Sequence, residues 1–202
     1  MSTQVLKNIR AVVFDLDGVY FESGTQTFIK KLQETFSLSE DEIKEVYLKS
    51  QQMQEYKKGL MSGDVFWAFA IKTWGIKVTK EELLNLLVQS YEENPATIEF
   101  ILHLRKKGVK IAACTNNFKE RIEGLQKRFG FKNNFDVFVA SCEEGVLKPD
   151  PAIFKIIAKK LGLSPQEILM SDDSEKVIDV LKDSGFQAFL YKGLADFKKR
   201  VS

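Results

Sequence analysis

Residues 11–19 read Ala-Val-Val-Phe-Asp-Leu-Asp-Gly-Val, a short apolar run followed by two aspartates and a glycine. Its first four residues are apolar, include β-branched side chains and end at Asp15, which is typical of a strand buried on both faces. Asp15 and Asp17 stand two residues apart, so their side chains project to the same side while the chain is extended. Two carboxylates crowded in this way repel each other unless a cation is close. The stretch therefore predicts a buried strand with a chemical site at its end.

Similar apolar runs recur in the second half of the chain, at 109–114, 137–140, 168–170 and 187–191. Between them, apolar residues follow helical spacing over 95–107, 151–162 and 175–184, and a glycine stands at or just after the end of each segment. Strands that alternate with helices predict a parallel sheet with helices on both faces. The predicted fold class is therefore α/β, with a Rossmann-like parallel sheet sandwiched by helices.

The segment 25–93 interrupts this alternation. It contains no strand pattern, and its four helical patterns cover about 25–37, 40–58, 62–75 and 80–93. Ser39 with Glu42 and Thr79 with Glu82 have the spacing of capping boxes that begin two of these helices. We interpret the segment as an inserted four-helix cap, although helices of one undivided domain would give the same pattern. The predicted domains are a core of 1–18 and 94–202, and a hairpin plus cap of 19–93.

Composition narrows the class of protein. The 202 residues suit one domain or one domain with an insert. A net charge of +2 is too balanced for a nucleic-acid binder, and no apolar run is long enough to span a bilayer. We see no secretory signal, and the two cysteines are in no paired motif, so we expect a cytoplasmic protein without a membrane partner. The sequence leaves the oligomeric state open, with a monomer favoured.

Polar residues stand at the ends of other predicted strands and at the start of a predicted helix. They are Thr115, Asn116, Lys148, Asp172 and Asp173. Each alone could be a turn or capping residue, but ligands bind at the carboxyl ends of the strands in an open parallel sheet. Carboxylates without histidine suit a hard cation such as Mg²⁺, and a single His, His103, leaves no histidine cluster. A lysine and a threonine beside such a cation suit a phosphoryl group.

This order of motifs resembles the haloacid dehalogenase superfamily over nearly the whole chain. The residues that carry the resemblance are 11–19 for the first motif, Thr115-Asn116 for the second, Lys148-Pro149-Asp150-Pro151 for the third and Asp172-Asp173-Ser174 for the fourth. The helical insert directly after the first motif is similar to the cap of one subgroup. Within the superfamily, the motifs are most similar to those of small sugar-phosphate phosphatases such as glucose-1-phosphatase, and of the phosphatase domain of epoxide hydrolases.

The resemblance implies a covalent mechanism. Asp15 would attack phosphorus and form an aspartyl-phosphate, and Asp17 would protonate the leaving alkoxide and then take a proton from water. Thr115 would hydrogen-bond a phosphoryl oxygen with help from the backbone amide of Asn116, and Lys148 would neutralise charge on the phosphoryl group and on Asp15. Mg²⁺ would be the cofactor and a small phosphorylated metabolite the substrate.

The resemblance also implies the metal ligands. They would be the Asp15 carboxylate, the backbone carbonyl of Asp17 and a carboxylate of the fourth motif, for which we expect Asp173 to bind directly and Asp172 through water. Many relatives carry Asn or Asp four residues after the direct ligand, where this chain has Val177. We therefore expect a millimolar Mg²⁺ requirement.

The second aspartate favours phosphoryl transfer over dehalogenation, because an alkoxide needs a proton on leaving and a halide does not. The leading prediction is a Mg²⁺-dependent phosphatase, with a sugar phosphate as the favoured substrate. The alternatives are a hexose-phosphate phosphomutase and a non-catalytic phosphate-binding scaffold. In the predicted cap, Lys58 in the loop 57–61 is the candidate substrate contact, although a solvated basic turn has the same composition.

Overall fold

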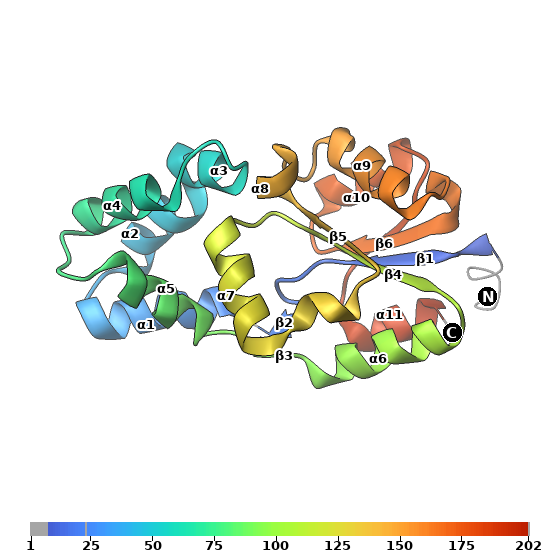
Figure 1. Cartoon of the computed structure of the whole chain (residues 1–202), viewed down its shortest axis with the longest axis horizontal. Coiled ribbons are helices and arrows are strands. Elements are labelled where there is room, and N and C mark those ends of the chain that lie inside the picture. The colour runs from blue at the N-terminus through green and yellow to red at the C-terminus, as the bar shows by residue number, and fades with distance from the viewer. Residues whose placement is uncertain (1–7, 23, 202) are drawn as a thin grey trace.

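The computed structural model describes residues 8–22 and 24–201. At its centre lies a parallel sheet of five strands in the order β5-β4-β1-β6-β7, so that the strand of the first motif is the middle one (Figure 1). The strands are β1 (Ala11–Phe14), β4 (Lys110–Thr115), β5 (Val137–Ala140), β6 (Ile168–Asp172) and β7 (Gln187–Leu190). The predicted α/β class and all five predicted strands are confirmed.

Alternate residues of β1 face opposite layers of helices. Val12 and Phe14 pack against α6 (Pro95–Lys106) and α11 (Leu194–Val201), whereas Ala11 and Val13 pack against α9 (Pro151–Leu161) and α10 (Glu175–Asp183). Figure 1 shows these two pairs of helices on opposite sides of the sheet. All four β1 side chains are fully buried, and full burial of one such apolar side chain contributes roughly 1.5–3 kcal/mol. The double-sided burial explains why β1 is an unbroken apolar run.

The remaining core helices lie near the carboxyl edge of the sheet or connect its strands. They are α7 (Lys119–Phe129), η3 (Phe131–Asn134), α8 (Ser141–Glu144) and η4 (Pro165–Glu167). Asn94 caps α6 by accepting the amides of Ala96 and Thr97, and Asp150 caps α9 by accepting the amide of Ala152. The cap at Asp150 begins α9 directly after the loop that carries Lys148. In the described part of the chain, no helix combines the length and apolar character that crossing a bilayer would require.

The insert is helical, as predicted. Its helices are α1 (Gly24–Phe36), α2 (Glu40–Lys44), η2 (Glu45–Lys49), α3 (Gln51–Lys57), α4 (Gly63–Trp74) and α5 (Lys80–Val88). The predicted helix 40–58 is interrupted at Ser50, whose backbone is extended at φ −60° and ψ 149°. The Ser50 hydroxyl accepts the amide of Met53, so this residue begins a new helix instead of continuing the old one.

A short ribbon joins the insert to the core. Phe21 and Glu22 form β2 and pair antiparallel with Glu92 and Glu93, which form β3. The prediction of no strand within 25–93 is therefore wrong at 92–93, and the partner of β2 comes from the far end of the insert instead of a local hairpin. Two-residue strands are too short to show a hydrophobic period. We propose this ribbon as the junction of the two predicted domains.

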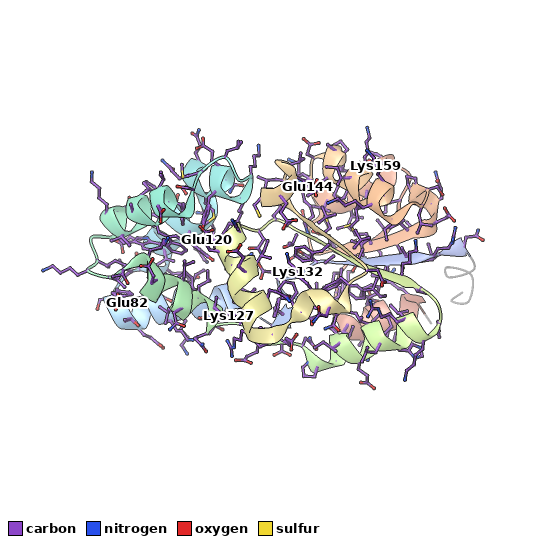
Figure 2. All side chains as sticks on the ribbon, viewed as in Figure 1. Glu82, Glu120, Lys127, Lys132, Glu144 and Lys159 are labelled. Carbon is purple, nitrogen blue, oxygen red and sulfur yellow. The ribbon has the colours of Figure 1, made fainter. Side chains whose placement is uncertain are left out.

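The insert rests on α7 and α8 of the core. The Tyr56 hydroxyl donates to Glu120, 2.5 Å away, and Figure 2 labels Glu120 where α7 meets the cap. The Ser141 hydroxyl of α8 donates to the backbone carbonyl of Lys57 at 2.6 Å. A β-carbon on Gly59, which has φ +70°, would come within 2.4 Å of a backbone oxygen of α8. The close approach thus requires glycine both for its size and for its backbone conformation.

Candidate active site

The carboxyl ends of β1, β4 and β6 open into a pocket of about 350 Å³. Seven residues predicted for the site line it, namely Asp15, Asp17, Thr115, Asn116, Lys148, Asp172 and Asp173. Lys58 does not line this pocket. The structure therefore brings together all the core residues of the predicted site, and their individual roles stay predictions.

Backbone geometry places the two aspartates of the first motif. Asp15 follows the last residue of β1, and the chain then turns at Gly18, which has φ +73°. The backbone carbonyl of the fully buried Leu16 accepts the amides of Tyr20 and Phe21 at 3.0 and 2.8 Å. These two hydrogen bonds close the turn. Gly18 is the residue type that adopts this left-handed conformation without strain. The turn keeps Asp17 beside Asp15 at the mouth of the sheet.

Lys148 lies at the centre of the charged groups. Its side chain is 5% exposed, and its Nζ is 3.0 Å from Asp15 Oδ2 and 2.8 Å from Asp172 Oδ2. Asn116 fixes the loop, since its side-chain amide donates to the Lys148 carbonyl at 2.9 Å and its Oδ1 accepts the Lys148 amide at 2.7 Å. The Asn116 side chain thus positions Lys148, a contact that sequence reasoning did not anticipate.

Burial and neighbouring charges shift the pKa values of Asp15 and Lys148. Burial raises the pKa of Asp15 to about 6; Lys148 opposes this, and Asp172 and Asp17 add to it. Burial disfavours the charge of Lys148, but Asp15 and Asp172 raise its pKa above the usual range. Lys148 therefore stays protonated, and it is the main cation that favours an ionised Asp15. A carboxylate held in this way at the floor of a pocket is suited to act as a nucleophile.

The two aspartates of the fourth motif have different surroundings. Asp172 ends β6, is 3% exposed, and contacts Lys148 through Oδ2 while its Oδ1 accepts the amide of Ser174 at 3.0 Å. Asp173 is exposed at the pocket. Asp172 is thus occupied in holding Lys148, whereas Asp173 has a carboxylate open to the pocket. Val177 is 5% exposed and also lines the pocket, where it offers no oxygen.

The donor set fits a magnesium ion. Among the described residues, no three His, Cys, Asp or Glu side chains gather closely enough to form a metal cage by themselves. Asp17 is paired with an arginine, and both oxygens of Asp172 are occupied, by Lys148 and by the amide of Ser174. The other oxygen donors at the pocket are the carboxylate of Asp15, which also contacts Lys148, the carboxylate of Asp173 and the backbone carbonyl of Asp17. Mg²⁺ is usually held by one or two carboxylates together with water and substrate phosphate. These three oxygen donors would hold it.

Arg121 is the principal site residue that sequence reasoning missed. It lies on α7, is 2% exposed, and its guanidinium is 2.9 Å from Asp17 Oδ2. Its Nε also donates to Asn117 Oδ1 at 2.5 Å. In the sequence, Arg121 stands in Lys-Glu-Arg, which has the appearance of an exposed helical surface. A buried arginine is rare unless it is paired, and only the fold reveals the pairing.

A second lysine of the cap, Lys57, ends α3, and its backbone carbonyl accepts the Ser141 hydroxyl of α8. Burial lowers the pKa of Lys57 to about 8, with repulsion from Arg121 adding to the effect and attraction from Asp17 and Asp15 opposing it. Lys58 ends α3 as its C-cap residue. Two adjacent lysines at a helix end cannot be told apart from the sequence without knowing the helical phase. The prediction for Lys58 stays a prediction, and Lys57 joins it as a candidate.

We expect Mg²⁺ affinity to be millimolar at neutral pH and to fall as pH decreases below about 6, because protons then compete with the cation for Asp15. Because burial raises the pKa of Asp15 to about 6, a proton competes with Mg²⁺ for this carboxylate at every pH below that value. The loss should approach about tenfold per pH unit. Titration calorimetry at several pH values would measure it, with Asp15→Asn as the control. Micromolar affinity, or affinity independent of pH, would contradict the expectation.

Comparisons with known sequences place this geometry in context. The family model for haloacid dehalogenase-like hydrolases matches residues 9–185. Pig (Sus scrofa) bifunctional epoxide hydrolase 2 is 24% identical over 203 residues, which cover 91% of this chain and 36% of that protein. Phosphorylated carbohydrates phosphatase of Thermotoga maritima is 25% identical over 183 residues, which cover 89% of this chain and 83% of that protein. The chain thus spans about a third of the pig relative and most of the bacterial one.

Solved structures share the fold. A HAD family enzyme of Bacteroides thetaiotaomicron, in complex with magnesium and inorganic phosphate, superposes with a TM-score of 0.74 at 22% identity, covering 91% of this chain and 94% of that one. The L-2-haloacid dehalogenase of Xanthobacter autotrophicus superposes with a TM-score of 0.65 at 20% identity, covering 89% and 76%. The same architecture therefore occurs in proteins described by different activities. The fold alone does not distinguish these activities, so function must be inferred from the residues of the site.

Proposed function

Because the chain belongs to the haloacid dehalogenase-like hydrolase family, we propose that it is a Mg²⁺-dependent phosphatase that hydrolyses a small phosphorylated metabolite. A sugar phosphate is the favoured substrate. The observation that carries the proposal is the buried Lys148 between Asp15 and Asp172, with Asp17 in the same pocket. The name of the Thermotoga maritima relative and the phosphate in the Bacteroides thetaiotaomicron structure support it.

In the first proposed step, Asp15 forms a bond from its carboxylate oxygen to phosphorus. The bond from phosphorus to the leaving oxygen breaks, and the leaving alkoxide takes a proton from Asp17. In the second step, Asp17 takes a proton from water as the water oxygen bonds to phosphorus. The acyl phosphate bond then breaks, and inorganic phosphate and the Asp15 carboxylate are released.

The remaining residues of the pocket bind charge. Lys148 and the Thr115 hydroxyl would contact phosphoryl oxygens, together with the backbone amide of Asn116. When bound, Mg²⁺ neutralises negative charge on the phosphoryl group and on Asp15. Thr115 is 1% exposed and ends β4, so it is held by the sheet. Donors fixed in advance stabilise the charge that develops in the transition state without having to reorganise.

Dehalogenation is the competing chemistry, because a haloacid dehalogenase shares the fold. Its halide leaves without a proton, so a pocket built for it has no use for a second acid. Asp17 lines the pocket of this chain with its side chain 38% exposed, where it can reach a leaving group. This favours hydrolysis of phosphate esters.

A panel of phosphorylated metabolites, assayed with Mg²⁺ for free phosphate and for isomerised sugar phosphate, tests the proposal. We expect free phosphate from at least one sugar phosphate. Isomerisation without phosphate release would instead identify a phosphomutase, which transfers the phosphoryl group back to the sugar. The absence of any Mg²⁺-dependent product, with phosphate binding retained, would identify a non-catalytic scaffold.

Asp17→Asn should lower kcat on an alkyl phosphate by about 10²–10⁴-fold, because the amide can neither protonate the alkoxide nor deprotonate water. Steady-state release of phosphate measures the change. The variant leaves the buried Arg121 without its carboxylate partner, so we expect a lower melting temperature, and kcat is compared at a temperature at which both proteins are folded. Turnover close to that of the wild type would mean that Asp17 is not the acid.

A further inference from the structure

Arg121 connects the aspartate proposed as the acid to the junction between cap and core. One side of its guanidinium contacts Asp17 at 2.9 Å. Another nitrogen donates to the Tyr91 hydroxyl at 2.6 Å, and that hydroxyl is 2.9 Å from the hydroxyl of Thr25. Tyr91 directly precedes β3, and Thr25 lies in the first turn of α1, after β2. The arginine thus links the first motif to both segments that join the insert to the core, the one after β2 and the one before β3.

The surroundings of Arg121 hold it firmly. Its Nε donates to Asn117, the rings of Phe118 and Tyr91 lie within 5.4 and 5.5 Å of the guanidinium carbon, and the side chain is 3% exposed. Asp17 raises the pKa of Arg121 despite its burial, and an arginine is never deprotonated in such a site. Arg121 does not line the pocket that holds Asp15 and Lys148. It therefore cannot deliver a proton and does not touch the phosphoryl group.

We propose that Arg121 is a positioning residue that holds the Asp17 carboxyl group in the orientation from which its protonated form donates to the leaving group. The inference rests on the proposed function. Asp17 is 38% exposed at the pocket, so its side chain has room to rotate, and the ion pair with a rigid guanidinium removes this freedom. A misplacement of about 1 Å can lower a rate by about 100-fold. The tie to Tyr91 sets that orientation relative to the cap.

The test compares two phosphate esters with different leaving groups. p-Nitrophenyl phosphate releases a stable phenolate that needs little protonation, whereas benzyl phosphate releases a poor leaving group that needs an acid. kcat/KM reports the steps up to the aspartyl-phosphate and so isolates the protonation of the leaving group. Arg121→Met should lower kcat/KM by about 100-fold for benzyl phosphate but by less than about fivefold for p-nitrophenyl phosphate.

Arg128→Met is the matched control. Arg128 lies on the same helix and contacts the same junction, since its guanidinium donates to the backbone carbonyls of Val88 and Tyr91 and to Glu92. Among the described residues, its ion-pair partner is Glu92, whereas Asp17 is paired with Arg121. We expect this variant to change kcat/KM for the two esters by the same factor. A loss of packing at the junction would therefore be separated from a loss of acid orientation.

A double-variant cycle shows whether Arg121 acts through Asp17. In the Asp17→Asn background, Arg121→Met should lower kcat/KM for benzyl phosphate by less than about threefold further, because the acid is already gone. Thermal melting checks the fold of each variant. If Arg121→Met is unfolded at the assay temperature, the losses of kcat/KM for the two esters are compared in Arg121→Lys instead. Lysine keeps the positive charge but lacks the planar guanidinium with its several fixed donors.

Equal losses on both esters, or losses that add in the Asp17→Asn background, would overturn the positioning role and leave the proposed function intact. Wild-type turnover of these esters that depends on Mg²⁺ and is lost in Asp15→Asn supports the proposed function by itself. A wild type that hydrolyses neither these esters nor any metabolite of the panel would overturn the proposed function, and the positioning role with it.

Discussion

Asp15→Asn is expected to lower turnover of every phosphate ester by at least about four orders of magnitude, because an amide oxygen cannot form the aspartyl-phosphate. The change keeps the shape of the side chain, and Asn can still accept the amide of Leu16, which contacts Asp15 Oδ1 at 2.7 Å. Phosphate release with excess Mg²⁺ measures the effect. Mass spectrometry of acid-quenched enzyme should find the phosphorylated chain in the wild type and not in the variant.

Stability provides the control for this loss. Folding raises the pKa of Asp15 from 3.8 to about 6, so its ionised form is disfavoured in the fold and stability falls as pH rises through that window. Asp15→Asn removes this dependence. At pH values above the window, the metal-free variant should therefore melt at or above the wild-type temperature. Turnover near the wild-type level in a folded variant would remove Asp15 from the mechanism, whereas a large fall in melting temperature would show that the lost charge mainly stabilised the fold.

Lys148→Met should lower both activity and stability. It leaves Asp15 and Asp172 as two buried carboxylates around an apolar side chain, and breaking a buried ion pair in this way costs about 3–5 kcal/mol of unfolding free energy. Activity should fall by about 10³-fold, since the phosphoryl group loses a fixed positive charge. Urea unfolding of the metal-free protein and kcat/KM measure the two effects.

The pH dependence distinguishes this explanation from simple loss of packing. Lys148 opposes the rise in the pKa of Asp15, so in the variant Asp15 binds its proton at higher pH and the stability deficit should shrink as pH falls toward about 6. Lys176→Met is the matched control, because Lys176 lines the same pocket but is exposed. We expect it to change stability by no more than about 0.5 kcal/mol. A Lys148→Met variant as stable as the wild type above pH 7 would refute the ion-pair account.

Much of the core follows from local sequence signals. The strands of the sheet are buried on one or both faces and leave apolar runs, and their order of alternation with helices predicts parallel pairing. The polar residues of the first, third and fourth motifs were found because each stands where an apolar run ends or a helix begins. Asp15, Lys148 and Asp172 thus meet in the structure as the parallel register requires.

The features that were missed depend on distant partners. The β2–β3 ribbon joins Phe21 to Glu93, and neither strand is long enough to show a pattern. The break at Ser50 depends on whether a serine caps a new helix or continues the old one, and both are compatible with the apolar spacing. Arg121 is buried because Asp17, in the turn of the first motif, and Tyr91, at the cap junction, both contact it. Sequence spacing carries no information about such encounters.

The ribbon has a consequence for how this architecture can vary. The chain leaves the sheet layer at Phe21 and returns at Glu93, and these two residues lie opposite each other in the β2–β3 ribbon. A segment whose ends lie side by side can be shortened, extended or exchanged while the strands that position Asp15 keep their places. We therefore expect that a foreign segment can be grafted between these two points without displacing the strands that hold Asp15.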